Sequence, residues 1–112
     1  MEDVFWLPKL YVVTRKDLPI GVQACQLAHA AREFAYLHTE MEEEWFEKSN
    51  AICFLSVGDE ESLEDLIHEA TGIDLKYAPF YEEALDKALT AVAFEPTLRS
   101  RKLLSQIPLA FC

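Results

Sequence analysis

The sequence lacks the segments and motifs that mark several large classes of protein. It has only three glycines and no Rossmann fingerprint, P-loop, HExxH or GxSxG motif, which excludes the common glycine-rich phosphate cradles and the usual zinc-protease and serine-hydrolase signatures. Its longest apolar stretches, such as residues 51–57, fall far short of the roughly 18 residues that a membrane span needs. The first six residues, MEDVFW, are acidic where a signal peptide would be basic. We therefore expect no export signal and a cytoplasmic location.

Cysteine and histidine are too few and too scattered to indicate disulfides or a metal site. The three cysteines are Cys25, Cys53 and Cys112, and the three histidines are His29, His38 and His68. An odd number of cysteines without CxxC spacing favours a reducing compartment. No histidine has another histidine or a cysteine at the spacing of zinc ligands. We expect no metal and no cofactor.

Short β-rich runs alternate with helical segments along the chain. The predicted strands are 9–15, 51–57, 75–80 and 89–94, with a last edge strand at 107–111, and the predicted helices are 20–37, 40–48, 60–71 and 98–105. Apolar residues make up 51% of the 112 residues, enough for the core of one domain spanning 1–112. The order predicts an α/β fold, a single-domain three-layer sandwich. Its sheet would be mixed, mostly parallel, with about four strands and helices on both faces.

The net charge of −10 is distributed unevenly. Residues 1–32 carry +1, residues 33–95 carry −14 and residues 96–112 carry +3. The acidic middle argues against binding a polyanion, whereas the two ends would form a locally positive face if the fold brought them together. The alternative is that the acids lie on ordinary solvated helix faces and the ends have no role.

The helix predicted at 20–37 combines a stripe of small residues with two polar side chains of chemical interest. Four alanines spaced three or four apart predict a stripe that packs closely on the sheet: Ala24, Ala28, Ala31 and Ala35. Gln26 and His29 are one turn apart, an arrangement in which an amide can orient an imidazole that acts as a general base. The alternative is a core histidine bonded to a backbone carbonyl.

Two further polar residues stand where ligands bind in such folds, beyond or near strand ends. Asp17 follows the first strand and could pair with His29 or, alternatively, form a surface ion pair with Arg15. Thr90 begins the fourth strand, where its hydroxyl could reach a neighbouring strand or simply favour β structure. For substrate binding, the candidates are Arg15, Lys16, Tyr81, Arg99, Arg101 and Lys102. Tyr81 would be a stacking platform and the others phosphate contacts, although a surface aromatic and ordinary helix-end cations are the alternatives.

Four segments in order carry a resemblance to a known family. They are KLYVVTRKDL (9–18), QLAHAA (26–31), VGDEESL (57–63) and LTAVAFEP (89–96). With these segments the chain resembles the second, archaeal and eukaryotic, type of peptidyl-tRNA hydrolase from about residue 9 to residue 111. The first two segments are the more specific.

The resemblance implies an α/β fold with a mixed four-stranded sheet and hydrolysis of the ester between a peptide, or an N-blocked amino acid, and tRNA. By position, Asp17, Gln26, His29 and Thr90 match the family's active-site residues. His29 would activate water, and a backbone amide at the start of the first helix would stabilise the oxyanion. Members of the family commonly pair, so a homodimer is expected. Residues 107–111 would then lie in its interface or pack on the chain's own sheet.

The chain also departs from the family pattern. The stretch after Asp-Leu is two residues shorter, and the position of a lysine implicated in catalysis falls on Val22. The family's acidic residue before the last strand has only approximate counterparts in Glu82 and Glu83. These departures leave a second hypothesis, an inactive fold relative that binds a basic protein partner. The first hypothesis predicts that Asp17, His29 and Thr90 line one cleft, with the basic residues on its rim.

Overall fold

The computed structural model describes residues 7–112, so the first six residues, on which the prediction about export depends, lie outside it. Four strands form one sheet in the order β2-β1-β4-β3. Their bounds are β1 Lys9–Arg15, β2 Ala51–Val57, β3 Tyr77–Glu82 and β4 Ala88–Phe94. None of the described helices is both long and apolar enough to cross a membrane.

The sheet is mixed, as predicted, but the expectation that it is mostly parallel is wrong. β1 and β2 are parallel, whereas β4 is antiparallel to both β1 and β3. The reason lies in the connection from β3 to β4, a single 3-10 turn, η2 (Glu83–Leu85). So short a connection returns the chain as a hairpin, whereas a parallel neighbour needs a longer crossover.

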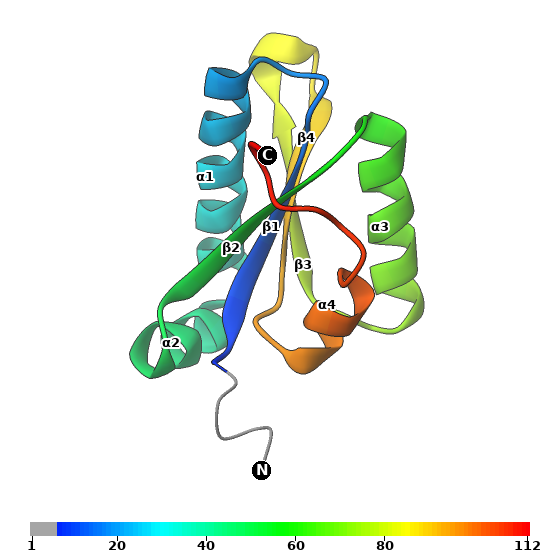
Figure 1. Cartoon of the computed structure of the whole chain (residues 1–112). Helices are drawn as coiled ribbons and strands as arrows, with labels where there is room; N and C mark the ends of the chain where they lie inside the picture. The colour runs from blue at the N-terminus through cyan, green and yellow to red at the C-terminus, as the bar shows by residue number, and fades with distance from the viewer. Residues whose placement is uncertain (1–6) are drawn as a thin grey trace.

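Helices cover both faces of the sheet, as the sequence predicted. α1 (Ile20–Leu37) and α2 (Thr39–Lys48) lie on one face, and α3 (Glu60–Gly72) and α4 (Leu98–Leu103) lie on the other (Figure 1). The core is correspondingly divided into two clusters. In β1, Leu10 and Val12 belong to the cluster beneath α1, and Tyr11 and Val13 belong to the cluster beneath α3, because successive side chains of a strand point to opposite faces.

The orientation of α1 differs from the expectation. Its buried residues are Gln23, Gln26, Leu27, Ala30 and Phe34, while Ala24 and Ala28 of the small-residue stripe are exposed. Burying large apolar side chains such as Leu27 and Phe34 removes more apolar area from water than burying alanines does. Gln23 and Gln26 are buried beside these side chains because both form hydrogen bonds. Gln23 Nε2, for example, donates to the Leu18 carbonyl at 2.6 Å.

The C-terminal residues lie along β2. Leu55 and Leu109 form an isolated antiparallel bridge, and the Ala110 amide donates to the Phe54 carbonyl at 2.9 Å. The predicted edge strand is thus reduced to a bridge, and Ala110 is buried. The segment packs on the chain's own sheet, which is one of the two alternatives considered for it.

Truncating a buried side chain of α1 tests this orientation. Phe34 is fully buried, whereas Tyr36 is 80% exposed on the same helix. We expect Phe34→Ala to lower the free energy of unfolding by about 3–5 kcal/mol and Tyr36→Ala to change it by less than about 0.5 kcal/mol. Urea unfolding followed by circular dichroism measures both values. Equal losses in the two variants would contradict the orientation described.

Candidate functional site

A hollow opens at the end of the sheet where β1 terminates. It has a volume of about 640 Å³ and is formed by the first turns of α1 and the start of the β3–β4 connection. Its lining residues are Pro19, Gly21, Val22, Cys25, Gln26, His29, Glu82, Ala84 and Leu85. Figure 1 shows the start of α1 and the β3–β4 turn side by side at the top of the molecule. Apolar side chains make up most of the walls, so the few polar side chains are the candidates for binding or catalysis.

His29 lies exposed in this hollow. Its ring stacks on that of Phe80 in β3, with ring centroids 4.5 Å apart and an interplanar angle of 10°. The stacking fixes the plane of the imidazole while leaving it accessible to solvent. The alternative of a core histidine is therefore wrong. The carboxylate near the ring is that of Glu82, which lines the same hollow.

Glu82 is held by a chain of hydrogen bonds that begins in the core. Thr90 Oγ1 donates to Gln26 Oε1 at 2.6 Å, and Gln26 Nε2 donates to Glu82 Oε1 at 3.0 Å. The hydrogen bond from Gln26, followed by that from the Ala84 amide, lowers the pKa of Glu82. Glu82 is therefore a carboxylate at neutral pH. The expectation that Gln26 orients His29 is wrong, because its amide bridges Thr90 and Glu82.

Thr90 reaches Gln26 through a β-bulge in β4. Phe80 pairs with Ala91, but the next residue, Tyr81, pairs with Leu89, so Thr90 is an extra residue in β4. A bulge turns its extra side chain out of the regular alternation, and Thr90 points to the α1 face. Its side chain is fully buried. Contrary to the expectation of one common cleft, Thr90 does not line the hollow, and it can act only through Gln26.

Asp17 forms an ion pair with Arg15. The guanidinium donates to both carboxylate oxygens, at 2.8 and 2.9 Å, and this pairing lowers the pKa of Asp17 and raises that of Arg15. The structure thus agrees with the alternative of a surface ion pair. Pairing between Asp17 and His29 is not found, and Asp17 does not line the hollow. The reason is geometric, since Arg15 lies two residues away on the same turn.

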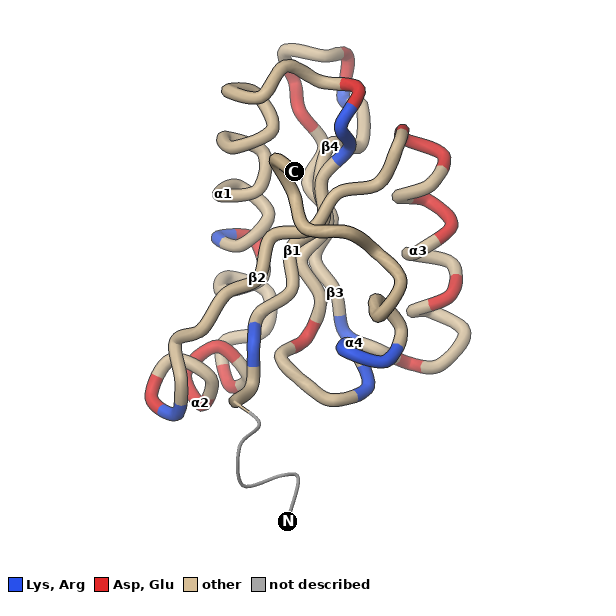
Figure 2. The backbone as a smooth tube through the Cα atoms, in the orientation of Figure 1, with Lys and Arg blue, Asp and Glu red and all other residues tan. Residues whose placement is uncertain are grey.

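Arg15 and Lys16 do not lie near the basic residues of α4. β4 runs antiparallel to β1, with Tyr11 opposite Phe94, so α4 lies at the end of the sheet remote from Arg15 (Figure 2). The expectation that Arg99, Arg101 and Lys102 lie on the rim of the site is therefore wrong.

The other candidates for substrate binding lie nearer to the hollow. Arg15 is the last residue of β1 and Lys16 follows it, so both are at the hollow's end of the sheet, although Lys16 lines a separate cavity on the α3 side with Ser62 and Asp65. Tyr81 is 53% exposed, but it follows Phe80 in β3, so its ring is directed to the face of the sheet opposite His29. Of the basic candidates, only Arg15 and Lys16 could approach a substrate bound beside His29.

The start of α1 offers backbone donors to the hollow. Pro19 is the N-cap and provides no side-chain cap, and the first intrahelical bond runs from the Gln23 amide to the Pro19 carbonyl at 2.9 Å. The amides of residues 20–22 precede this bond and have no intrahelical acceptor. Gly21 and Val22 line the hollow, so the positive end of the helix dipole lies at its wall. Among the residues that the structure describes, no lysine or arginine lines it.

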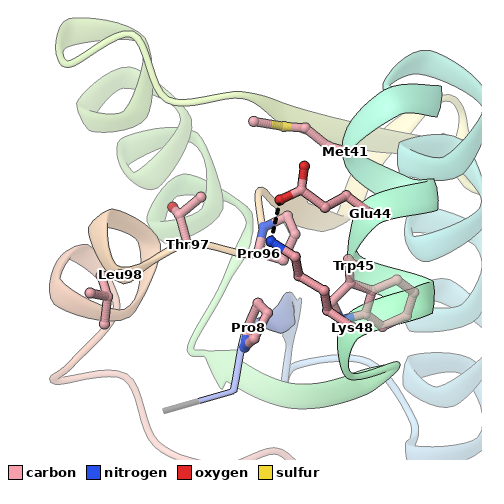
Figure 3. A pocket seen from close by; sticks show the side chains of 8 residues that line it. All are labelled: Pro8, Met41, Glu44, Trp45, Lys48, Pro96, Thr97 and Leu98. Atoms are coloured by element: carbon pink, nitrogen blue, oxygen red, sulfur yellow. Dashed lines mark hydrogen bonds and ion pairs between the residues drawn. The ribbon is translucent and has the colours of Figure 1, made fainter. Parts of the chain in front are cut away.

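Another cavity, of about 300 Å³, lies at the opposite end of the molecule and is mostly apolar (Figure 3). Its charged groups are Glu44 and Lys48, which pair with each other at 2.9 Å. Its lining contains no histidine, cysteine or serine. In residues 7–112, no cluster of three or more His, Cys, Asp or Glu side chains is placed to hold a metal ion. The hollow beside His29, which brings an exposed imidazole and a carboxylate together, is the candidate site.

Comparisons with known proteins bear on both fold and function. The family model described as peptidyl-tRNA hydrolase PTH2 matches residues 8–105. The chain is also similar in structure to a protein of unknown function from Agrobacterium tumefaciens, with a TM-score of 0.68 and 14% identity, over 90% of this chain and 96% of that one. At this identity the likeness shows the fold alone. None of the curated proteins matches the chain.

Removing the Gln26 amide tests the hydrogen-bond chain. In Gln26→Met we expect the pKa of the Glu82 carboxyl to rise toward its ordinary value, because that bond is the main cause of its lowering. A pKa lowered by folding stabilises the protein above the ordinary pKa, and this stability is lost as the pH falls through the lowered one. The variant should therefore lose less stability on acidification. Carbon NMR titration of the Glu82 carboxyl measures the shift.

Cys25→Ser is the control, because Cys25 also lines the hollow and is exposed. This variant should leave the titration of Glu82 unchanged. A Gln26→Met protein whose Glu82 titrates as in the wild type would rule out the described bond.

Proposed function

This chain belongs to the peptidyl-tRNA hydrolase PTH2 family, and we propose that it hydrolyses the ester between a peptide, or an N-blocked amino acid, and tRNA, releasing free tRNA. The observation that carries the proposal is the exposed His29 ring, which shares a hollow with the carboxylate of Glu82 at the uncapped start of α1. The proposal places the reaction in the cytoplasm and needs no metal or cofactor.

His29 is the general base of this proposal. A neutral ring nitrogen takes a proton from water as the water oxygen attacks the ester carbonyl carbon. The resulting imidazolium is stabilised by the Glu82 carboxylate in the same hollow, as a buried carboxylate does in serine hydrolases. Stacking on Phe80 holds the ring in place during the transfer. The imidazolium then returns the proton to the ribose oxygen as the ester bond breaks.

The start of α1 supplies the electrostatic stabilisation that this reaction needs. Attack of water places a negative charge on the former carbonyl oxygen, and preorganised N–H donors stabilise such a charge. The amides of Gly21 and Val22 belong to the unpaired first turn. The apolar walls of the hollow provide the low dielectric in which these donors act strongly.

Gln26 and Thr90 serve as positioning residues in this mechanism. Gln26 is almost fully buried and binds Glu82 through its amide group. Thr90, fully buried beneath it, fixes which end of the amide faces Glu82, because its hydroxyl donates to Gln26 Oε1. The Nε2 donor is then directed at the carboxylate. Neither residue is required to touch the substrate.

The tRNA itself would be contacted from the same end of the sheet. Tyr81 offers an exposed ring for stacking on a terminal base, and Lys16 offers positive charge at this end of the sheet, whereas the charge of Arg15 is balanced by Asp17 and Glu60. The cations of α4 are too remote for the acceptor end bound at His29 and could meet only a distant part of the tRNA. A homodimer remains part of the proposal.

One observation favours the second candidate, an inactive relative that binds a basic protein. Val22, at the position of the family's lysine, lines the hollow, and no lysine or arginine takes its place there. Acidic residues are also frequent along α2 and α3 (Figure 2). A basic partner would associate with them at rates that fall as the salt concentration rises.

Replacing His29 tests the catalytic assignment. We expect His29→Ala to lower kcat/KM for peptidyl-tRNA by about 10²–10⁴-fold, the range of general-base catalysis. His68→Ala is the matched control, because His68 is exposed on α3 and should leave the rate unchanged. The release of free tRNA, followed on gels, measures both. Equal turnover by the His29 variant and the wild type would remove the assignment, and an inactive wild type would favour the second candidate.

Restoring a cation to the hollow tests the role of Val22. Val22→Lys places an ammonium group beside the unpaired amides, and we expect kcat to rise by about tenfold or more, since single preorganised donors contribute about 10²–10³-fold. Ala24→Lys introduces the same charge on an exposed face of the same helix, outside the hollow. It should not change kcat. A similar rise in both variants would indicate a general electrostatic effect on tRNA binding.

A further inference from the structure

On the side that faces β1, the main chain of Leu89, next to the bulge in β4, is bound by two side chains rather than by a strand. Its amide donates to Glu60 Oε2 at 2.8 Å, and its carbonyl accepts from Arg15 Nη1 at 3.1 Å. Arg15 and Glu60 also lie 3.8 Å apart as an ion pair. A carboxylate and a guanidinium therefore bind the amide and the carbonyl of one residue.

The end of β1 explains why these side chains are needed. β1 pairs with β4 only from Tyr11–Phe94 to Thr14–Ala91, so the ladder stops before Leu89. In an antiparallel pair, the amide and carbonyl of one residue point to the same neighbour. Leu89 is buried, and unpaired buried main-chain groups are costly. Glu60 and Arg15 take the place of the missing strand residue.

The position of Glu60 is fixed by the start of α3. Asp59 is the N-cap, and its carboxylate accepts from the Ser62 amide at 2.9 Å and from the Ser62 hydroxyl at 2.8 Å. Glu60 is the first residue of the helix, where the helix dipole favours a negative charge. Its carboxylate is thus held at the end of the sheet, beside the first residues of β4.

The bulge connects this clamp to the candidate site. The Thr90 carbonyl accepts from Thr14 Oγ1 at 2.8 Å, so the main chain of residues 89–90 is bound at three atoms by side chains from α3 and β1. With its main chain fixed in this way, the Thr90 hydroxyl points at Gln26. We propose that Glu60 is a positioning residue of the site, which holds the bulge through Leu89 so that Thr90 and Gln26 direct Glu82 toward His29.

The role of Glu60 in catalysis rests on the proposed function, whereas its effect on the geometry of the site does not. The experiment therefore has two readouts that need no activity: hydrogen exchange of the Leu89 amide and the NMR titration of the Glu82 carboxyl. Glu60→Ala and Glu60→Asp should each speed the exchange of the Leu89 amide by roughly tenfold or more, because a charge-assisted hydrogen bond is lost. In both variants the pKa of Glu82 should rise.

Glu60→Gln keeps a side-chain oxygen that can accept from Leu89 and should restore wild-type exchange and titration. Glu61→Ala is the control, because Glu61 is an exposed neighbour in the same turn. If the wild type hydrolyses peptidyl-tRNA, Glu60→Ala should lower kcat by about 10-fold to 100-fold with little change in KM, since misplaced groups cost about that much. Glu60→Gln should restore kcat.

Two results would overturn the inference. In the first, the Leu89 amide exchanges alike in Glu60→Asp and Glu61→Ala. In the second, exchange is faster but the Glu82 titration stays as in the wild type, so that the clamp does not reach the site. An inactive wild-type protein would contradict the proposed function, and the two NMR readouts would still decide the role of Glu60.

Discussion

The hydrogen bond from the buried Thr90 hydroxyl to Gln26 is the contact on which the site depends. It is short, 2.6 Å, and lies where no water competes for either group. It determines which end of the Gln26 amide faces outward, and so a donor rather than an acceptor meets Glu82. Without this constraint the amide could turn, and the carboxylate in the hollow would have no fixed partner. The chemistry at the surface thus depends on a polar contact in the core.

The fold could be predicted largely from local pattern. The apolar runs at 9–15 and 51–57 became β1 and β2 with unchanged bounds. Continuous apolar sequence suits β1, which is buried on both faces, whereas β2 is an edge strand and only partly buried. The direction of β4 could not be read in this way. It depends on a 3-10 turn at Glu83–Leu85, where the acidic sequence carried no clear turn signal. One short connection therefore decided whether the sheet is mostly parallel.

The site was predicted in part. His29 was identified from its helix position, and its exposure agrees with the functional interpretation. The partners of Gln26 and Asp17 were wrong, however. Side-chain pairing at these positions is decided by tertiary contacts, since Gln26 meets residues 56 and 64 positions away along the chain. The bulge at Thr90 has no sequence signature here, because an extra residue in a strand is visible only once its neighbour is placed.

The central position of β1 has a consequence for synthesis on the ribosome. The strand formed from residues 9–15 receives its neighbours at very different times, because β2 ends at Val57 whereas β4 ends at Phe94. Until the later strand emerges, one edge of β1 is open and can pair with the edge of another nascent chain. The species most prone to aggregation during synthesis is thus the incomplete polypeptide that already contains α1 to α3 but not yet β4.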